Sequence, residues 1–133
     1  MHRTFSGLRL FDQNPSTGKN KLYNILKVYS LYDPDVGYTQ GMSFISAIIL
    51  MVVENDDALA WMIFVKVLSV CSDWRRHYEE NTPKLFEVTK LLRAFIKTEL
   101  PKLNKALNEH NVILESLIAS PFLTLFANLI PVD

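Results

Sequence analysis

The sequence predicts an all-α fold of about six helices, and three observations support this prediction. Apolar residues recur at helical spacing, and in the segment 19–32 they fall at i, i+3, i+4 and i+7: Leu22, Ile25, Leu26 and Tyr29. No stretch of the chain alternates apolar and polar residues as a half-buried strand does. Prolines and short polar segments interrupt the apolar pattern at points where helices can begin or end.

A loop and then a helix are expected near the start of the chain. Residues 6–18 include Pro15 and Gly18 among several turn-forming residues, and this composition predicts a loop. The helical pattern follows over 19–32. The sequence Asp-Pro-Asp at 33–35 ends that helix, because a proline disfavours the helical conformation of the residue before it.

The next two helices are the most apolar of the chain. Thr39 is expected to be the N-cap of the first, which places Gln40 in its first turn. This helix, which contains the apolar run 42–53, is apolar nearly all round, as is typical of a helix at the centre of a domain. One of the two aspartates at positions 56 and 57 is expected to cap the second, which runs through residue 72.

The second half of the chain is more amphipathic. Thr82-Pro83 has the pattern of an N-cap followed by a first helical residue. Ser120-Pro121 repeats it, which predicts one helix over 111–119 and a last helix over 122–129. Pro101 separates the two helices that lie between these patterns. Their apolar faces are expected to hold Leu85, Val88, Leu92 and Phe95, and then Leu103 and Leu107.

The composition is that of an ordered globular chain and excludes several classes of protein. Of 133 residues, 49% are hydrophobic, 21% are charged and four are glycine, which predicts one domain or a large part of one. The formal net charge is zero, so no nucleic-acid partner is expected. A single cysteine, Cys71, excludes a disulfide framework and fits a reducing compartment. The apolar runs 42–53 and 58–70 are shorter than the ~20 residues that span a bilayer, and no signal peptide is expected.

The chain carries no pattern for binding a metal or a phosphate of its own. Its three histidines are too far apart for metal-ligand spacing. Residues 12–16 begin like a calcium loop, but Thr17 stands where that loop requires glycine. Gly18-Lys19 is not a P-loop, since Asn20 stands where Ser or Thr is needed. We therefore expect no metal site.

Two kinds of charged cluster allow more than one interpretation. The sequence Trp-Arg-Arg-His-Tyr at 74–78 suits a patch that faces a partner, but a basic helix end with an anchored aromatic is simpler and is favoured. The pairs Asp56-Asp57 and Glu79-Glu80 are interpreted as caps and solvated surface rather than as paired catalytic carboxylates.

Two polar residues indicate a function. Gln40 lies between Gly37 and Gly41, immediately before the apolar run, and Arg3 lies near the start of the chain. A guanidinium can neutralise charge that develops on a phosphate, and a carboxamide can orient an attacking water. Such a pair suits the completion of another protein's phosphoryl-transfer site. Considered singly, each residue is more simply a polar residue of the surface or of a helix start.

Three segments resemble the signature segments of TBC domains, which are GTPase-activating proteins for Rab GTPases. They are Arg3-Thr4-Phe5, the run from Tyr29 to Met42 with its Gly-Tyr-Thr-Gln-Gly-Met end, and Ser120 to Ala127. They occur in the family's order, and the 37-residue step from Arg3 to Gln40 is the family's as well. Thr39 stands where the family often has Cys, and Pro121 where it often has an aromatic residue.

The resemblance implies that Arg3 and Gln40 are the catalytic residues, inserted as an arginine finger and a glutamine finger into the site of a Rab GTPase in its GTP form. GTP and Mg²⁺ would belong to that partner, and this protein would need no cofactor and turn over no substrate of its own. The supporting motif would comprise Thr4, Gly37, Tyr38, Thr39, Gly41 and Met42. A cytoplasmic protein of vesicle trafficking is implied, peripheral to endomembranes and reaching them only indirectly.

The resemblance also implies the extent of the domain. Residues 1–133 are expected to form about the N-terminal two-thirds of a TBC domain, beginning inside the first motif and ending before the C-terminal helices. An alternative function stays open at this point: a noncatalytic module of TBC type that binds or scaffolds a small GTPase.

Overall fold

The described structure is entirely helical. The computed structural model describes residues 15–54, 56–69, 73–127 and 129, and within them it contains six α-helices, one 3-10 helix and no strand. The all-α prediction is therefore confirmed. The elements in chain order are α2 (Pro15–Tyr32), α3 (Met42–Val52), α4 (Asp57–Ser69), η1 (Trp74–His77), α5 (Pro83–Glu99), α6 (Pro101–Glu109) and α7 (Leu114–Leu123).

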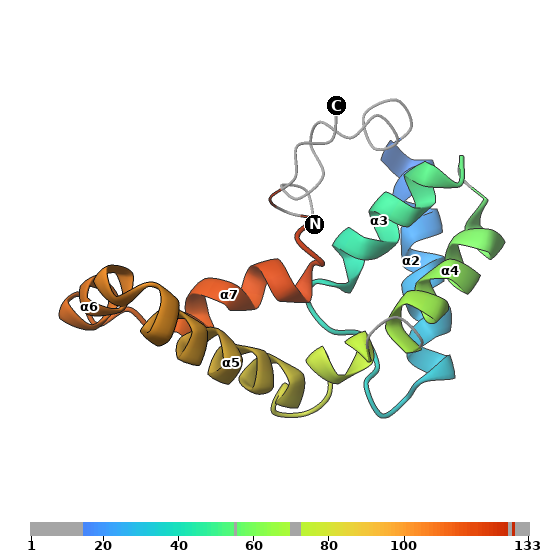
Figure 1. The fold of residues 1–133 in the computed structure, drawn as a ribbon. Coiled ribbons are helices and arrows are strands. Elements are labelled where there is room, and N and C mark those ends of the chain that lie inside the picture. The colour runs from blue at the N-terminus through green and yellow to red at the C-terminus, as the bar shows by residue number, and fades with distance from the viewer. Residues whose placement is uncertain (1–14, 55, 70–72, 128, 130–133) are drawn as a thin grey trace.

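Helices α2, α3 and α4 pack against one another and enclose the larger hydrophobic core. Figure 1 shows them as one group, with α3 beside both of the others. The four apolar residues that the sequence placed on one face of α2 are all buried there. Helix α3 contributes buried residues on most of its circumference, as predicted for a helix apolar nearly all round: Met42, Ser43, Ile45, Ser46, Ala47 and Leu50.

Helices α5, α6 and α7 form a second group that extends away from the first (Figure 1). Their smaller core is built on Leu85, Ile96, Leu114 and Ile118. The prediction that Phe95 lines this core was wrong, because its side chain is 56% exposed. Thr89 is buried in the apolar stripe instead, and its hydroxyl donates a hydrogen bond to the Leu85 carbonyl at 2.8 Å. Because its hydroxyl is hydrogen-bonded, Thr89 can lie on the buried face of α5, and that face continues to Ile96 rather than to Phe95.

Several helix ends differ from the predicted ones. Helix α2 begins at Pro15, so residues 15–18 are helical rather than part of a loop. Proline suits a first helical position, because the N–H that it lacks would have no partner inside the helix. The N-cap of α3 is Gly41 rather than Thr39, and Gln40 precedes the helix. Asp56 does cap α4, where its Oδ1 accepts the Leu59 N–H at 3.0 Å.

The predicted break at Ser120-Pro121 was also wrong, because α7 runs through it to Leu123. A proline inside a helix lacks the N–H that would reach the carbonyl four residues back, here that of Leu117, and α7 ends only two residues beyond Pro121. The carbonyls around the proline still find donors: Ser120 accepts the Thr124 N–H at 3.1 Å, and Pro121 accepts the Phe126 N–H at 2.7 Å. The predicted helix start at Thr82-Pro83 is confirmed, since Thr82 is the N-cap and Pro83 the first residue of α5. The Thr82 side chain, however, makes no capping hydrogen bond.

A helix that crosses a bilayer must be both long and apolar. None of the helices that the structure describes combines the length and the apolar character that crossing a bilayer requires.

Candidate functional site

Gln40 lies in the connection between α2 and α3, which we call the Gln40 loop (residues 33–41). At its start, the Asp33 carbonyl accepts the Gly37 N–H at 2.8 Å. Gly37 has φ +62°, a left-handed conformation that glycine adopts without strain. Gln40 is exposed at the last position before the N-cap of α3. The loop therefore presents the carboxamide to solvent, where another protein can reach it.

The residues around Gln40 divide into exposed and buried ones. Tyr38 is 51% exposed and borders a surface hollow of about 450 Å³ together with residues of α2, namely Tyr23, Leu26, Lys27 and Ser30. Met42 is completely buried in the larger core, and the Thr39 N–H lies 3.4 Å from its Sδ. Along the chain, Gln40 therefore lies between the exposed Tyr38 and the buried Met42.

The start of the Gln40 loop is held by an ion pair. Arg75 donates from Nε to Asp33 Oδ2 at 2.6 Å and from Nη2 to Asp33 Oδ1 at 2.8 Å. The Tyr29 hydroxyl donates to Asp33 Oδ2 at 2.9 Å. These hydrogen bonds, those from Arg75 first, keep the pKa of Asp33 below its usual value. Since the Asp33 side chain is only 12% exposed, the carboxylate forms a charged, largely sheltered anchor between the loop and η1.

The end of the Gln40 loop is held by close backbone packing. Gly41 is buried with φ +108°, and a Cβ added to it would lie 2.3 Å from the Leu123 carbonyl oxygen. Only glycine fits there without movement of α7. The same Leu123 oxygen accepts the Tyr78 hydroxyl at 2.6 Å. Burial raises the pKa of Tyr78, so its hydroxyl remains a donor.

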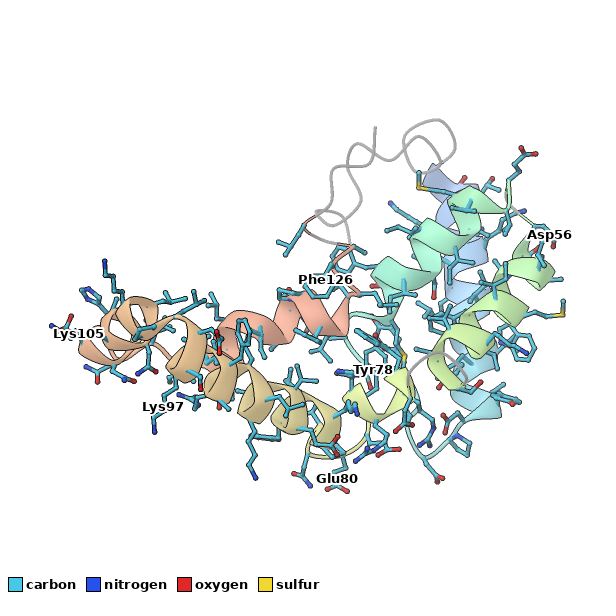
Figure 2. All side chains as sticks on the ribbon, viewed as in Figure 1. Asp56, Tyr78, Glu80, Lys97, Lys105 and Phe126 are labelled. Atoms are coloured by element: carbon cyan, nitrogen blue, oxygen red, sulfur yellow. The ribbon has the colours of Figure 1, made fainter. Side chains whose placement is uncertain are left out.

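The segment 74–78 lies at the junction of the two groups of helices, where Figure 2 labels Tyr78. The rings of Trp74 and His77 stack with centroids 4.3 Å apart, and the Phe122 ring stacks 5.9 Å from His77. The favoured interpretation of an anchored aromatic is therefore correct for this segment. Its arginines, however, pair with acids: Arg76 reaches Glu87 at 2.6 Å, as Arg75 reaches Asp33.

The structure places the predicted site residues as far as it describes them. Gly37, Tyr38, Thr39, Gln40, Gly41 and Met42 are consecutive in the Gln40 loop and at the first position of α3. Arg3 and Thr4 lie outside the described residues, so the pairing of Arg3 with Gln40 stays a prediction. Among the residues that the structure describes, no group of three or more His, Cys, Asp or Glu side chains could hold a metal ion.

Sequence reasoning missed the partners that hold the loop. Asp33 was interpreted only as a helix stop, and Arg75 only as part of a basic cluster. The one available signal was chemical: an arginine beside buried aromatics suits a carboxylate partner. It gave no indication of which of the chain's acids would be that partner.

Comparison with known proteins gives a consistent picture. A family model described as the Rab-GTPase-TBC domain matches residues 1–133. Growth hormone-regulated TBC protein 1 of Rattus norvegicus is 28% identical over 134 residues, covering 100% of this chain and 45% of that protein. Rab GTPase-activating protein tbc-11 of Caenorhabditis elegans is 34% identical over 135 residues (100% and 14%). TBC1 domain family member 1 of Homo sapiens is 34% identical over 134 residues (97% and 11%). The chain spans less than half the length of these relatives.

Proposed function

This chain belongs to the Rab-GTPase-TBC domain family, and from that premise we propose that it forms the catalytic part of a GTPase-activating protein for a Rab GTPase in its GTP form. The observation that carries the proposal is the presentation of Gln40. An exposed carboxamide stands on a short loop whose two ends are both fixed, at Asp33 and at Gly41. A residue that must act inside another protein's site has to be both exposed and held.

In this proposal each finger performs one task in the partner's site. The Gln40 carboxamide forms hydrogen bonds with the attacking water, in which its oxygen accepts and its NH₂ group donates. These bonds orient the water toward the γ-phosphate. The Arg3 guanidinium neutralises the charge that develops on the phosphate oxygens. An arginine finger contributes roughly 10³–10⁵ in rate, which corresponds to about 4–7 kcal/mol of barrier. GTP and Mg²⁺ belong to the GTPase, and contact with a membrane is indirect, through the GTPase or through further domains.

The test is single-turnover GTP hydrolysis by a panel of GTP-loaded Rab proteins, with the full-length protein that contains this chain. We expect acceleration of at least one Rab, with a loss on the order of 10²-fold or more in Arg3→Ala and in Gln40→Ala. Asn108→Ala, which removes an exposed carboxamide from the distant α6, is the matched control and should leave the rate unchanged.

Three results would count against the proposal in different ways. Acceleration that survives both finger substitutions would mean that the catalytic groups lie elsewhere. Binding of a GTP-loaded Rab without acceleration would favour the noncatalytic module. Failure to bind any Rab of the panel would refute both functions for those partners.

A further inference from the structure

We propose that Arg75 and Tyr78 are positioning residues for Gln40, and that the segment 74–78 acts as a clamp on both ends of the Gln40 loop. The inference rests on the proposed function of Gln40 in GTP hydrolysis. It assigns a role to two residues that lie outside the loop, between α4 and α5.

The first half of the clamp fixes where the loop leaves α2. Arg75 holds both oxygens of Asp33, at 2.6 Å and 2.8 Å, so the carboxylate can neither rotate nor shift without losing a hydrogen bond. A bidentate pair of this kind defines orientation as well as distance. The Asp33 backbone is in turn the acceptor of the Gly37 N–H, which connects the ion pair to the turn that leads toward Gln40.

The second half of the clamp fixes where the loop enters α3. The Leu123 carbonyl oxygen lies against Gly41, the residue next to Gln40. Tyr78 donates its hydroxyl to that same oxygen at 2.6 Å and is itself only 4% exposed. Because the carbonyl is held by Tyr78, it forms a rigid stop for the Gly41 backbone.

Rigidity of the backbone matters because Gln40 is exposed. An exposed side chain is not oriented by neighbours of its own, so its approach to a water depends on where the loop places its Cα. Catalytic groups have to be held within about 0.5 Å of the productive geometry. A misplacement of about 1 Å can cost roughly 10²-fold in rate. Both anchors therefore act on catalysis through Gln40, without contact with the nucleotide.

The first experiment compares two neighbouring arginines in the full-length protein. Arg75→Gln removes the ion pair with the loop together with the one to Glu79. Arg76→Gln removes the ion pairs with Glu87 of α5 and with Asp73, and it spares the loop. With a responsive GTP-loaded Rab as substrate, we expect Arg75→Gln to lower kcat about 10–100-fold with little change in KM. Arg76→Gln should stay within about twofold of the parent protein. Equal losses in the two variants would overturn the inference.

A double-mutant cycle separates positioning from a general structural effect. In a Gln40→Ala background there is no carboxamide left to position, so Arg75→Gln should cause no further loss of kcat. The same fold-loss in both backgrounds would overturn the inference. Tyr78→Phe, which removes only a hydroxyl, should show the same dependence on Gln40 and guards against a variant that fails to fold.

Amide hydrogen exchange on the protein without a partner tests the clamp independently of activity. Arg75→Gln and Tyr78→Phe should speed exchange in residues 37–42, and Arg76→Gln should not. Unchanged exchange in the first two variants would refute the clamp, whether or not a Rab is activated. Faster exchange in a protein that accelerates no Rab would refute the proposed function and leave the clamp standing.

Discussion

Gly41→Ala is expected to destabilise the protein strongly, and the structure gives the magnitude. The added Cβ would lie 2.3 Å from the Leu123 oxygen, against an ordinary contact of 3.4 Å or more, so the carbonyl would have to move by roughly 1 Å. That shift breaks the hydrogen bond from the buried Tyr78 hydroxyl, at about 1–3 kcal/mol. A non-glycine residue at φ +108° costs about 1–3 kcal/mol more.

Gly37→Ala is the matched control for this prediction. Gly37 also has a positive φ, +62°, but an added Cβ would meet nothing within 4 Å. Its cost is the conformational term alone, about 1–2 kcal/mol. Both substitutions restrict the unfolded chain equally, so that contribution cancels in the comparison. We therefore expect Gly41→Ala to cost about 1–4 kcal/mol more than Gly37→Ala.

Urea denaturation followed by circular dichroism measures the difference. With a slope of about 2 kcal/mol/M, the midpoint of Gly41→Ala should lie about 0.5–2 M below that of Gly37→Ala. Midpoints that coincide would show that α7 yields to the added methyl group. The close approach of Leu123 would then not define the end of the Gln40 loop.

Two further predictions concern stability outside the loop. Burial lowers the pKa of His77, so the unfolded chain takes up the proton first as pH falls. The free energy of unfolding should therefore be highest above pH ~6.5 and should decline below it by up to about 1.4 kcal/mol per pH unit. Urea midpoints at pH 7.5 and 5.5 should show this decline in the parent protein and in His110→Gln, a control at an exposed position, but not in His77→Phe. A decline of equal size in His77→Phe would mean that other groups cause it. Asp56→Ala should cost about 1 kcal/mol by thermal denaturation, since the Leu59 N–H loses its acceptor, whereas Asp56→Asn keeps a capping oxygen and should cost little. Equal losses in both Asp56 variants would indicate that charge, and not capping, matters there.

The helices could be predicted from the sequence because their signals are local. The spacing of Leu22 and Ile25 in α2, and the apolar run of α3, identify buried faces that the structure confirms. The failures occurred where a local rule competed with packing. Ser120-Pro121 has the pattern of a helix start, yet Phe122 packs in the smaller core and Leu123 against the larger one, and this packing keeps both residues on the end of α7.

A turn between α2 and α3 could be predicted, but the sequence did not show that it extends through Gln40 to Gly41, and it did not identify the anchors. Two glycines near one glutamine identify a turn from neighbouring residues alone. The ion pair of Asp33 and Arg75 joins residues 42 positions apart. The contact of Gly41 with Leu123 depends on how α7 lies against the first group of helices. Nothing in a single sequence specifies such distant pairings, because they arise from the tertiary packing of helices whose relative placement the sequence pattern leaves open.

The distance along the chain between the two anchors has a consequence for synthesis. Arg75 is made 48 residues before Leu123, counted from position 75 to position 123. At about 5–20 residues per second, this interval lasts roughly 2–10 s on the ribosome. During that time Asp33 can already pair with its arginine, while Gly41 still lacks the backbone that closes over it. Completion of α7 is thus the step at which a nascent chain acquires a finished Gln40 loop, and a chain interrupted before Leu123 would carry its glutamine on a loop fastened at one end only.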